Sequence, residues 1–298
     1  MVFVEIRHGV GNQMMQYAFA RKIAEERGED VYVVKRWYRE EDWKRNEETK
    51  RKYQLGKFEI SAKKATKSQE KKFWINRDSI VSKAKTYVSK KLQINPGGNV
   101  FFGRCMYKNP EKNIDKISEC EGDVYLVGMW KHVNYFGDIL DKIRKEFRVK
   151  NIKTKNENLI EKMNQYNSVS IHTRRGDYLN TEHRVLSETK YYKNAVNLIY
   201  RKEDNIKAYI FSDDIRWCKK NFNLSIPVKY VDENRGEDSY KDIALMKNCK
   251  HNIVANSTFS LWGALLNDSK KKMVIGPEGW TQRMGRQYID KITSVGLD

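Results

Sequence analysis

The 298-residue chain has no long apolar segment. A helix that crosses a membrane needs roughly 18 to 20 consecutive apolar residues, and no run approaches that length. Residues 1–13, MVFVEIRHGVGNQ, also lack the apolar stretch and the small-residue cleavage site of a secretory signal. We therefore expect a cytoplasmic protein that is neither exported by that route nor membrane-spanning.

Cysteine is scarce and irregularly spaced. The four cysteines lie 15, 98 and 31 positions apart: Cys105, Cys120, Cys218 and Cys249. This spacing matches neither CxxC metal pairs nor a dense disulfide framework. We expect reduced thiols packed in the interior.

Motifs for several common chemistries are absent. The sequence contains no P-loop, HExxH, GxSxG elbow or kinase motif set, and its five histidines are not paired at metal-ligand spacing. It also has no DxD motif, which would hold a metal-bridged diphosphate. We expect neither a metal nor a cofactor.

Positive charge is the unusual feature. The formal net charge is +19, and residues 35–91 hold 19 Lys and Arg against 8 Asp and Glu, so +11 of it comes from that segment. Such a surface attracts polyanions. We predict a solvated, mainly helical basic segment over residues 35–92, with peripheral contact to the anionic inner face of a membrane as the alternative. The segment is lysine-dominated and matches no nucleic-acid module, so a basic nucleic-acid-binding protein is a remote alternative and we expect no nucleic-acid partner.

Composition indicates a folded chain, since 39% of residues are hydrophobic and 12% aromatic. At roughly 150 residues per domain, the length suggests two domains or one large one.

The N-terminal half predicts these elements in order: strand 2–6, glycine turn 9–13, helix 14–27 ended by Gly28, strand 30–34, strand 124–129 and amphipathic stretch 135–147. A polar segment then places the domain boundary near residue 155.

The second half alternates strands and helices strictly. The predicted strands are residues 168–172, 208–212, 228–231, 252–255 and 273–275. The predicted helices are residues 191–201, 215–222, 240–247 and 258–267. This alternation predicts a parallel, doubly wound α/β sheet, in which ligands bind beyond the carboxyl ends of the strands.

The most informative motif, HTRRGDY at residues 172–178, follows the first of these strands. Two adjacent arginines, Arg174 and Arg175, can present guanidinium groups to a diphosphate and stabilise a departing phosphate. The alternative is that one of them pairs with Asp177 for support.

Two other strand ends in this half also suit a nucleotide. Ser212, Asp213 and Asp214 can contact a base or ribose, or cap the next helix. The segment Asn256, Ser257, Thr258 and Phe259 offers hydroxyls, backbone N–H groups and an aromatic ring.

Near the N-terminus, Gly9, Gly11 and Asn12 form a glycine turn that opens a helix and can cradle an anion. A turn used only for close packing is an equal alternative.

In order along the chain, these motifs resemble those of the bacterial α-1,2-fucosyltransferases of glycosyltransferase family 11. GVGNQMMQYAFAR at 9–21 is similar to the family pattern GLGNQMFQYAFA, and SIHTRRGDY at 170–178 is similar to HxRRGDY. Three later blocks also resemble the family: FSDDIRWCK at 211–219, DIALMKNCKHNIVANSTFSLWGALLN at 242–267 and IGPEGW at 275–280. The likeness covers nearly the whole chain.

The resemblance implies a GT-B-like α/β fold with two Rossmann-like domains facing a central cleft. Residues 156–298 would bind GDP-fucose, and residues 1–155 would form the acceptor side. Arg174 would contact the donor β-phosphate without a metal, and Asn12 would close over the phosphates or acceptor from the opposite wall. The other binding residues implied are His172, Arg175, Ser212, Asp213, Asn256, Ser257, Thr258, Phe259 and Gly11.

The implied activity is an inverting galactoside 2-α-L-fucosyltransferase that transfers fucose from GDP-fucose to a glycan or lipid-linked oligosaccharide in surface polysaccharide or O-antigen biosynthesis. A related GT-B transferase with another nucleotide sugar is the alternative. The acceptor hydroxyl benefits from a base, for which Asp177 is the candidate and Glu5 and Glu237 stay open.

Four positions depart from the family pattern. His8 stands where relatives have glycine and Met15 where they have phenylalanine, both on the implied acceptor side. Leu261 and Leu265 replace tryptophans, and we interpret them as core substitutions.

Overall fold

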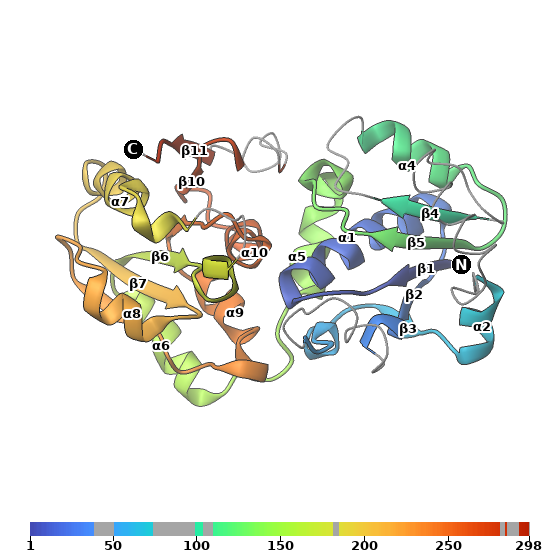
Figure 1. Cartoon of the computed structure of the whole chain (residues 1–298), viewed down its shortest axis with the longest axis horizontal. Coiled ribbons are helices and arrows are strands. Elements are labelled where there is room, and N and C mark those ends of the chain that lie inside the picture. Colours follow the sequence, from blue (N-terminus) through green and yellow to red (C-terminus); the bar gives the residue numbers. More distant parts are fainter. Residues whose placement is uncertain are drawn as a thin grey trace. The chain divides into compact units, whose positions relative to one another are not determined.

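The computed structural model describes residues 1–38, 51–73, 99–103, 110–180, 185–280, 284 and 292–297. The chain divides into two compact units. Met1–Leu55 and Ile60–Ile139 form the first, and Gly56–Glu59 and Leu140–Asp298 form the second. Each unit contains its own parallel β-sheet with helices packed on it (Figure 1). The prediction of two Rossmann-like α/β halves is confirmed, and the cleft between them stays a prediction.

The division between the units comes before residue 155, because helix α5 (Leu140–Glu146) belongs to the second unit. Arg144 Nε donates to the backbone oxygen of Leu265 at 3.0 Å. Phe147, just after α5, packs edge-on against Trp262 with ring centroids 5.0 Å apart. The packing of α5 and Phe147 on α10 (Thr258–Leu266) therefore places these residues in the second unit. The polar segment near residue 155, on which the predicted boundary rested, gives no sign of these contacts.

The first sheet has the strand order β3-β2-β1-β5-β4, and all its neighbours are parallel. Its strands are β1 (Val2–Glu5), β2 (Val31–Val34), β3 (Ala62–Lys64), β4 (Val100–Gly103) and β5 (Val124–Gly128). Its helices are α1 (Val10–Arg27), α2 (Lys67–Lys72) and α4 (Pro110–Ser118). The short 3-10 helices of this part are η1 (Arg36–Tyr38), η2 (Leu55–Lys57), η3 (Val133–Tyr135) and η4 (Gly137–Ile139).

Helix α1 is the central helix of the first unit. The four apolar residues that predicted it are all buried: Met14, Tyr17, Ala18 and Ala24. Gly28 ends the helix in the left-handed conformation, with φ 62°, and its N–H bonds back to the last turn. A residue without Cβ adopts this conformation at little cost, so the predicted helix stop is confirmed.

The basic segment 35–92 is only partly described, because residues 39–50 and 74–98 lie outside the described residues. Within the rest, β3 is a strand and α2 is a short helix, so the mainly helical prediction is wrong there. Pairing with β2 supplies backbone hydrogen bonds that override the local pattern, and an edge strand tolerates lysines.

The second sheet has the order β11-β10-β9-β6-β7-β8 and is parallel throughout. Its strands are β6 (Asn167–Thr173), β7 (Ile206–Ser212), β8 (Val228–Tyr230), β9 (His251–Ile253), β10 (Val274–Pro277) and β11 (Ile292–Val295). Its further helices are α6 (Thr154–Asn164), α7 (Tyr191–Tyr200), α8 (Ile215–Asn221), α9 (Lys241–Lys247) and α10 (Thr258–Leu266). Its 3-10 helices are η5 (Gly176–Asn180), η6 (Leu186–Glu188) and η7 (Gly236–Asp238).

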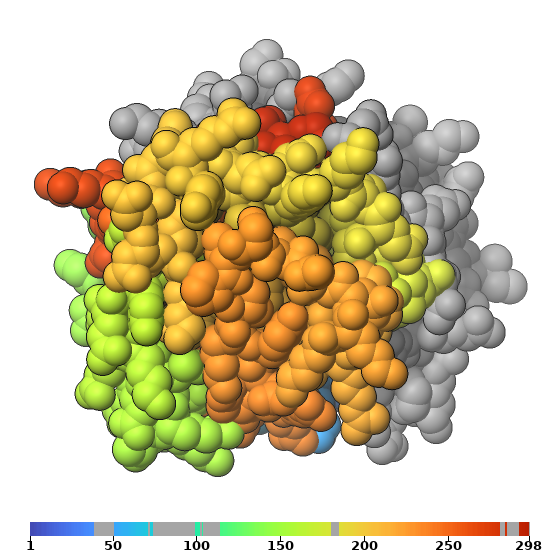
Figure 2. Space-filling view, turned by 90° about the vertical axis from the view of Figure 1, so that its left-hand side faces the viewer, coloured from blue at the N-terminus to red at the C-terminus, as the bar shows by residue number. Residues whose placement is uncertain are grey.

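The direction in which successive strands are added to this sheet reverses between β6 and β9. From β6 the chain runs outward through β7 to β8, then returns to β9 and runs outward the other way. The apolar side chains of α7 and α8 form one core with the sheet, and α9 and α10 pack together elsewhere in the unit. Figure 2 views the unit from the side where α8 (orange) lies below α7 (yellow). The predicted doubly wound sheet is confirmed, and a ligand site is expected beside β6 and β9.

Two smaller expectations have outcomes here. Cys218 and Cys249 are free thiols and are buried, as predicted, whereas Cys120 is only half-buried and Cys105 lies outside the described residues. No helix in the described ranges is both long and apolar enough to cross a membrane.

Candidate functional site

Arg174 directly follows β6 and lies between two carboxylates. Its Nη2 is 2.8 Å from Asp177 Oδ1, and its Nη1 is 3.0 Å from Asp213 Oδ2. Burial lowers the pKa of this guanidinium, but Asp213 and Asp177 outweigh burial and raise it. The side chain stays 21% exposed. Arg174 is therefore a fixed cation, partly open to solvent, at the edge of the sheet where ligands bind.

Asp213 follows the neighbouring strand β7 and joins the two strand ends. Its Oδ1 accepts a hydrogen bond from the backbone N–H of Arg175 at 2.9 Å, while its Oδ2 faces Arg174. A Cβ on Gly176 would lie 2.7 Å from that Oδ2, which explains the glycine in the RRGD motif. In this structure Asp213 positions Arg174, and its predicted contact with a nucleoside stays a prediction.

Arg175 is 6% exposed and is engaged by protein groups. Its Nη1 donates to Ser187 Oγ at 2.8 Å and lies 3.3 Å from Glu188 Oε1. Its guanidinium carbon is 3.7 Å from the centre of the Trp217 ring in α8. Arg175 is thus held by protein groups, whereas the pairing with Asp177 that the sequence left open as the alternative is made by Arg174.

His172 is 3% exposed at the end of β6, and its ring centroid is 5.3 Å from that of Phe259. Burial, assisted by the charge of Arg174, lowers the pKa of His172 to about 3. Within the described residues its Nδ1 has no hydrogen-bond partner. A neutral imidazole with an unsatisfied nitrogen suits contact with a polar ligand better than a charge pair with phosphate.

Helix α10 begins next to this group. Ser257 is its N-cap, accepting from the N–H of Phe259 at 3.3 Å, and Thr258 is its first residue. The hydroxyl of Tyr178 donates to the backbone oxygen of Asn256 at 3.0 Å and ties the loop after β6 to the entrance of α10. The helix N-terminus predicted for the diphosphate therefore adjoins the Arg174 loop.

The two aspartates that follow β7 have different roles. Asp214 caps α8 by accepting from the N–H of Trp217 at 3.2 Å, and Ser212 Oγ accepts from the N–H of Asp214 at 3.0 Å. The sequence left open that one of the two aspartates caps the next helix. In the structure Asp214 does so.

Gly11 and Asn12 lie in the first unit, in the first turn of α1 after the carboxyl end of β1. The next residue, Gln13, is fully buried and clamps the turn: its Nε2 donates to His8 O at 2.9 Å and to Lys52 O at 2.8 Å. Helix α1 begins at Val10, so the predicted turn over residues 9–13 is wrong in extent: the first turn of the helix takes its place. The predicted contact of Asn12 with phosphates or acceptor stays a prediction.

The departures from the family pattern have structural explanations. His8 occupies the left-handed region with φ 62°, where glycine is the least strained residue. Met15 is fully buried in α1, so it is a core position. Leu261 and Leu265 are also buried, as predicted.

Of the other base candidates, Glu5 is engaged. It is 3% exposed, accepts from Arg7 Nε at 2.8 Å and accepts from the Tyr125 hydroxyl at 3.0 Å. Glu237 lies in η7, after β8.

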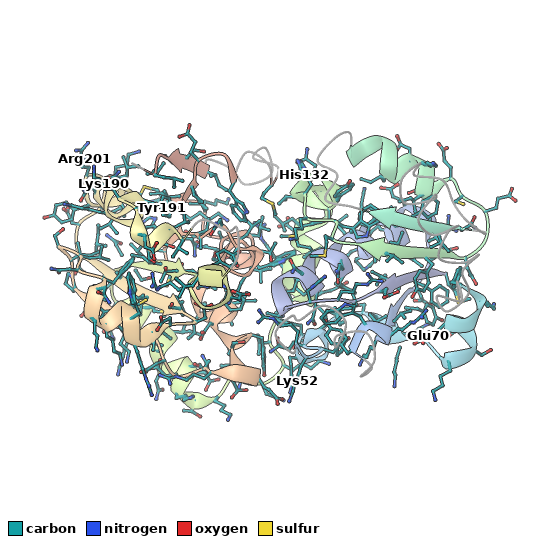
Figure 3. The ribbon with its side chains drawn as sticks, in the orientation of Figure 1. Lys52, Glu70, His132, Lys190, Tyr191 and Arg201 are labelled. Carbon is teal, nitrogen blue, oxygen red and sulfur yellow. The ribbon has the colours of Figure 1, made fainter. Side chains whose placement is uncertain are left out.

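Several supporting residues had no separate signal in the sequence. Tyr192 Oη donates to His172 O at 2.8 Å, and Tyr191, labelled in Figure 3, donates to the backbone oxygen of Val254 at 2.7 Å. Both tyrosines come from α7 and bond to the backbone at the carboxyl ends of β6 and β9. Trp217 lies inside the FSDDIRWCK block and Tyr178 inside the RRGDY motif, so both could have been noticed.

In the ranges that the structure describes, no three His, Cys, Asp or Glu residues gather closely enough to hold a metal ion. Whether the reaction needs a metal stays a prediction.

Comparisons with known proteins agree with these motifs. The family model "Glycosyl transferase family 11" matches residues 1–294. The chain is 30% identical to the alpha-1,2-colitosyltransferase of Escherichia coli, over 95% of this chain and 93% of that protein. It is 29% identical to the O-antigen biosynthesis glycosyltransferase WbnK of Escherichia coli, over 91% and 92%. Human galactoside alpha-(1,2)-fucosyltransferase 1 is 29% identical over 33% of this chain and 28% of its own.

Solved structures support the fold. The NodZ alpha-1,6-fucosyltransferase soaked with GDP-fucose matches with a TM-score of 0.51 and 14% identity, over 89% of this chain and 92% of that chain. A mutant of Arabidopsis thaliana FUT1 in complex with GDP matches with a TM-score of 0.54 and 12% identity, over 94% of this chain and 71% of that chain. These likenesses confirm an α/β, GT-B-like fold. The family match over residues 1–294 and the 30% identity with the Escherichia coli colitosyltransferase identify the chain as a glycosyltransferase that belongs to glycosyltransferase family 11.

Proposed function

We propose that this protein is an inverting, metal-independent galactoside 2-α-L-fucosyltransferase that uses GDP-fucose in surface polysaccharide or O-antigen biosynthesis. The observation that carries the proposal is the partly exposed Arg174 guanidinium, held between Asp177 and Asp213 at the carboxyl ends of β6 and β7. Relatives named for galactoside fucosyl transfer and O-antigen biosynthesis support the product class. Solved neighbours bound to GDP or GDP-fucose support the donor.

In the proposed reaction, the bond between sugar C1 and the β-phosphate oxygen breaks and its electron pair leaves with GDP. The acceptor hydroxyl oxygen bonds to C1 from the opposite face, so a β-linked donor gives an α-linked product. Arg174 stabilises the charge that develops on the departing phosphate, which is the role a divalent cation has in other enzymes. The hydroxyl proton passes to a base.

We propose Asp177 as the residue that orients Arg174, because the two lie 2.8 Å apart. It stays the candidate base only if that contact opens when substrates bind. Glu5 is a weaker candidate because Arg7 and Tyr125 already occupy its oxygens, and Glu237 stays open.

Colitosyl transfer is a second candidate, favoured by the 30% identity with a colitosyltransferase over 95% of this chain. A phosphate-binding arginine does not distinguish the sugars, so the donor must be tested directly. The acceptor would be a glycan or a lipid-linked oligosaccharide, met at the inner face of the bacterial membrane.

The test is a thermal-shift and hydrolysis screen against GDP-fucose, GDP-colitose, GDP-mannose and UDP-galactose, with and without EDTA. The expected result is stabilisation by GDP, turnover of GDP-fucose that EDTA leaves unchanged, and strongly reduced turnover by Arg174→Ala. Turnover of GDP-colitose alone would favour the second candidate. Preference for a UDP sugar, or turnover that EDTA abolishes, would reject the proposed donor or the metal independence.

A further inference from the structure

The carboxyl edge of the first sheet carries two lysines from neighbouring strands. Lys35 directly follows β2 and Lys64 ends the neighbouring strand β3, where the register pairs Val33 with Lys64. In the described part of the chain, neither ammonium group lies in an ion pair. The Lys35 Nζ instead lies 3.7 Å from the centre of the Tyr53 ring.

Holding these two cations together is unfavourable in the free protein. Lys35 is half-buried, and burial together with the charge of Lys64 lowers the pKa of its ammonium group. A partly buried cation is normally stabilised by a carboxylate, and a second cation in that place destabilises it further. An anion bound between them would remove both penalties.

A row of partly or fully buried aromatic side chains adjoins Lys35. Tyr53 packs edge-on to Tyr38, Tyr38 to Trp37, and Trp37 against His8, with ring centroids 6.2, 5.0 and 4.9 Å apart. The Tyr38 hydroxyl donates to His8 O at 2.8 Å. Aromatic rings beside a few fixed polar groups are typical of sites that bind small molecules.

The segment that carries Tyr53 is held in place. Gln13 of α1 donates to Lys52 O, the residue labelled in Figure 3, and its Oε1 accepts from the N–H of Gln54 at 2.8 Å. Lysine and aromatic ring therefore meet on a fixed framework, which lowers the cost of ordering them around a ligand.

Charge at a sheet edge explains the lysines of the edge strand β3 but not Lys35. Lys63, next to Lys64 in β3, is 58% exposed and lies 2.5 Å from Asp30, as expected for a charge that protects an edge strand. Lys35 follows an inner strand of the sheet, and so no edge needs protection there.

We propose that Lys35, Lys64 and Tyr53 form an acceptor subsite that binds an anionic group of the glycan acceptor. The group is a carboxylate of an acidic sugar or the diphosphate of a lipid-linked acceptor, since both present oxygens that two ammonium groups recognise. The subsite lies beyond the carboxyl ends of parallel strands, where such sheets bind ligands. The identity of the ligand as an acceptor rests on the proposed function, whereas anion binding does not.

The experiment is a calorimetric titration of the full chain without nucleotide sugar. The probes are tetragalacturonate with neutral galactotetraose as its control, and farnesyl diphosphate with farnesol as its control. We expect at least one anionic probe to bind, its neutral control not to bind, and binding to weaken as salt is raised. Tetragalacturonate binding would identify the sugar carboxylate, and farnesyl diphosphate binding would identify the lipid diphosphate.

Lys35→Gln and Lys64→Gln should each weaken that binding about tenfold, the expected effect of losing one charged hydrogen bond. Lys63→Gln is the matched control and should leave it unchanged. Binding of neither anion, equal binding of charged and neutral probes, or equal loss in Lys63→Gln would overturn the subsite. Because no donor is present, these outcomes are independent of whether the protein transfers fucose.

Discussion

Asp213 Oδ2 lies 3.0 Å from Arg174 Nη1, and the two residues come from the ends of different strands. Strands β6 and β7 pair in register through Thr173 and Ser212, so the residues that follow them face each other. The same carboxylate accepts the N–H of Arg175 through its other oxygen. One side chain from β7 thus fixes both the backbone and the guanidinium of the loop after β6.

Asp213→Asn should lower kcat about 10- to 100-fold, because it removes the charge that orients Arg174 while an amide oxygen can still accept from Arg175. Steady-state kinetics with GDP-fucose measure the change. Asp214→Asn is the matched control: asparagine caps helices as well as aspartate does, so turnover and stability should stay close to wild type. Equal kcat in the two variants would show that Asp213 does not position Arg174.

Substitution of Arg174 should affect mainly turnover, and substitution of Arg175 mainly stability. Arg174→Ala should reduce turnover about 100- to 1,000-fold with little loss of stability, since it removes charge stabilisation at the leaving group. Arg175→Ala should lower the free energy of unfolding by about 2 kcal/mol, because it removes buried contacts with Ser187 and Trp217. Chemical denaturation and kinetics on both variants test this, and a reversed pattern would contradict the assignment.

Two buried histidines should make the protein sensitive to acid. Burial lowers the pKa of His172 to about 3 and that of His251 to about 4, against about 6.5 in the unfolded chain. Between pH 6.5 and about 4 the unfolded chain binds protons that the folded chain does not. The free energy of unfolding therefore falls as pH falls, by up to about 1.4 kcal/mol per unit for each histidine.

Denaturant unfolding of wild type and His251→Gln at pH 5 and pH 7 measures this effect. The variant should lose less stability between the two pH values, and both proteins should be insensitive to pH from 7 to 8 at this site. An identical fall in the variant would mean that His251 is already protonated in the fold.

His8 should reveal backbone strain at the end of β1. With φ 62°, a residue with a Cβ is strained there. His8→Gly and His8→Ala both remove the ring that contacts Trp37, so the difference between them isolates the backbone. His8→Gly should be the more stable by about 1 kcal/mol in thermal or chemical unfolding. Greater stability of His8→Ala would show that the backbone relaxes.

Much of the second unit could be predicted from sequence. Alternating apolar runs and helices identify β6 to β10 and α7 to α10 to within a few residues, because the central strands are buried runs of apolar residues and the helices bury apolar side chains. Strands β3 and β4 were not predicted. Their residues gain strand structure only by pairing with β2 and β5, which lie far away along the chain.

The sequence by itself determined the family, the parallel α/β class and the strand end that carries Arg174. A short motif shows which chemical groups are present at a strand end, and the periodicity of apolar residues predicts which faces of a helix or strand are buried. Only the tertiary structure decided which of two adjacent arginines stays open to a ligand, because the answer depends on Asp213 and Trp217 from other elements. The tertiary structure also decided that Lys35 and Lys64 come close enough for their charges to interact, because β2 and β3 pair side by side.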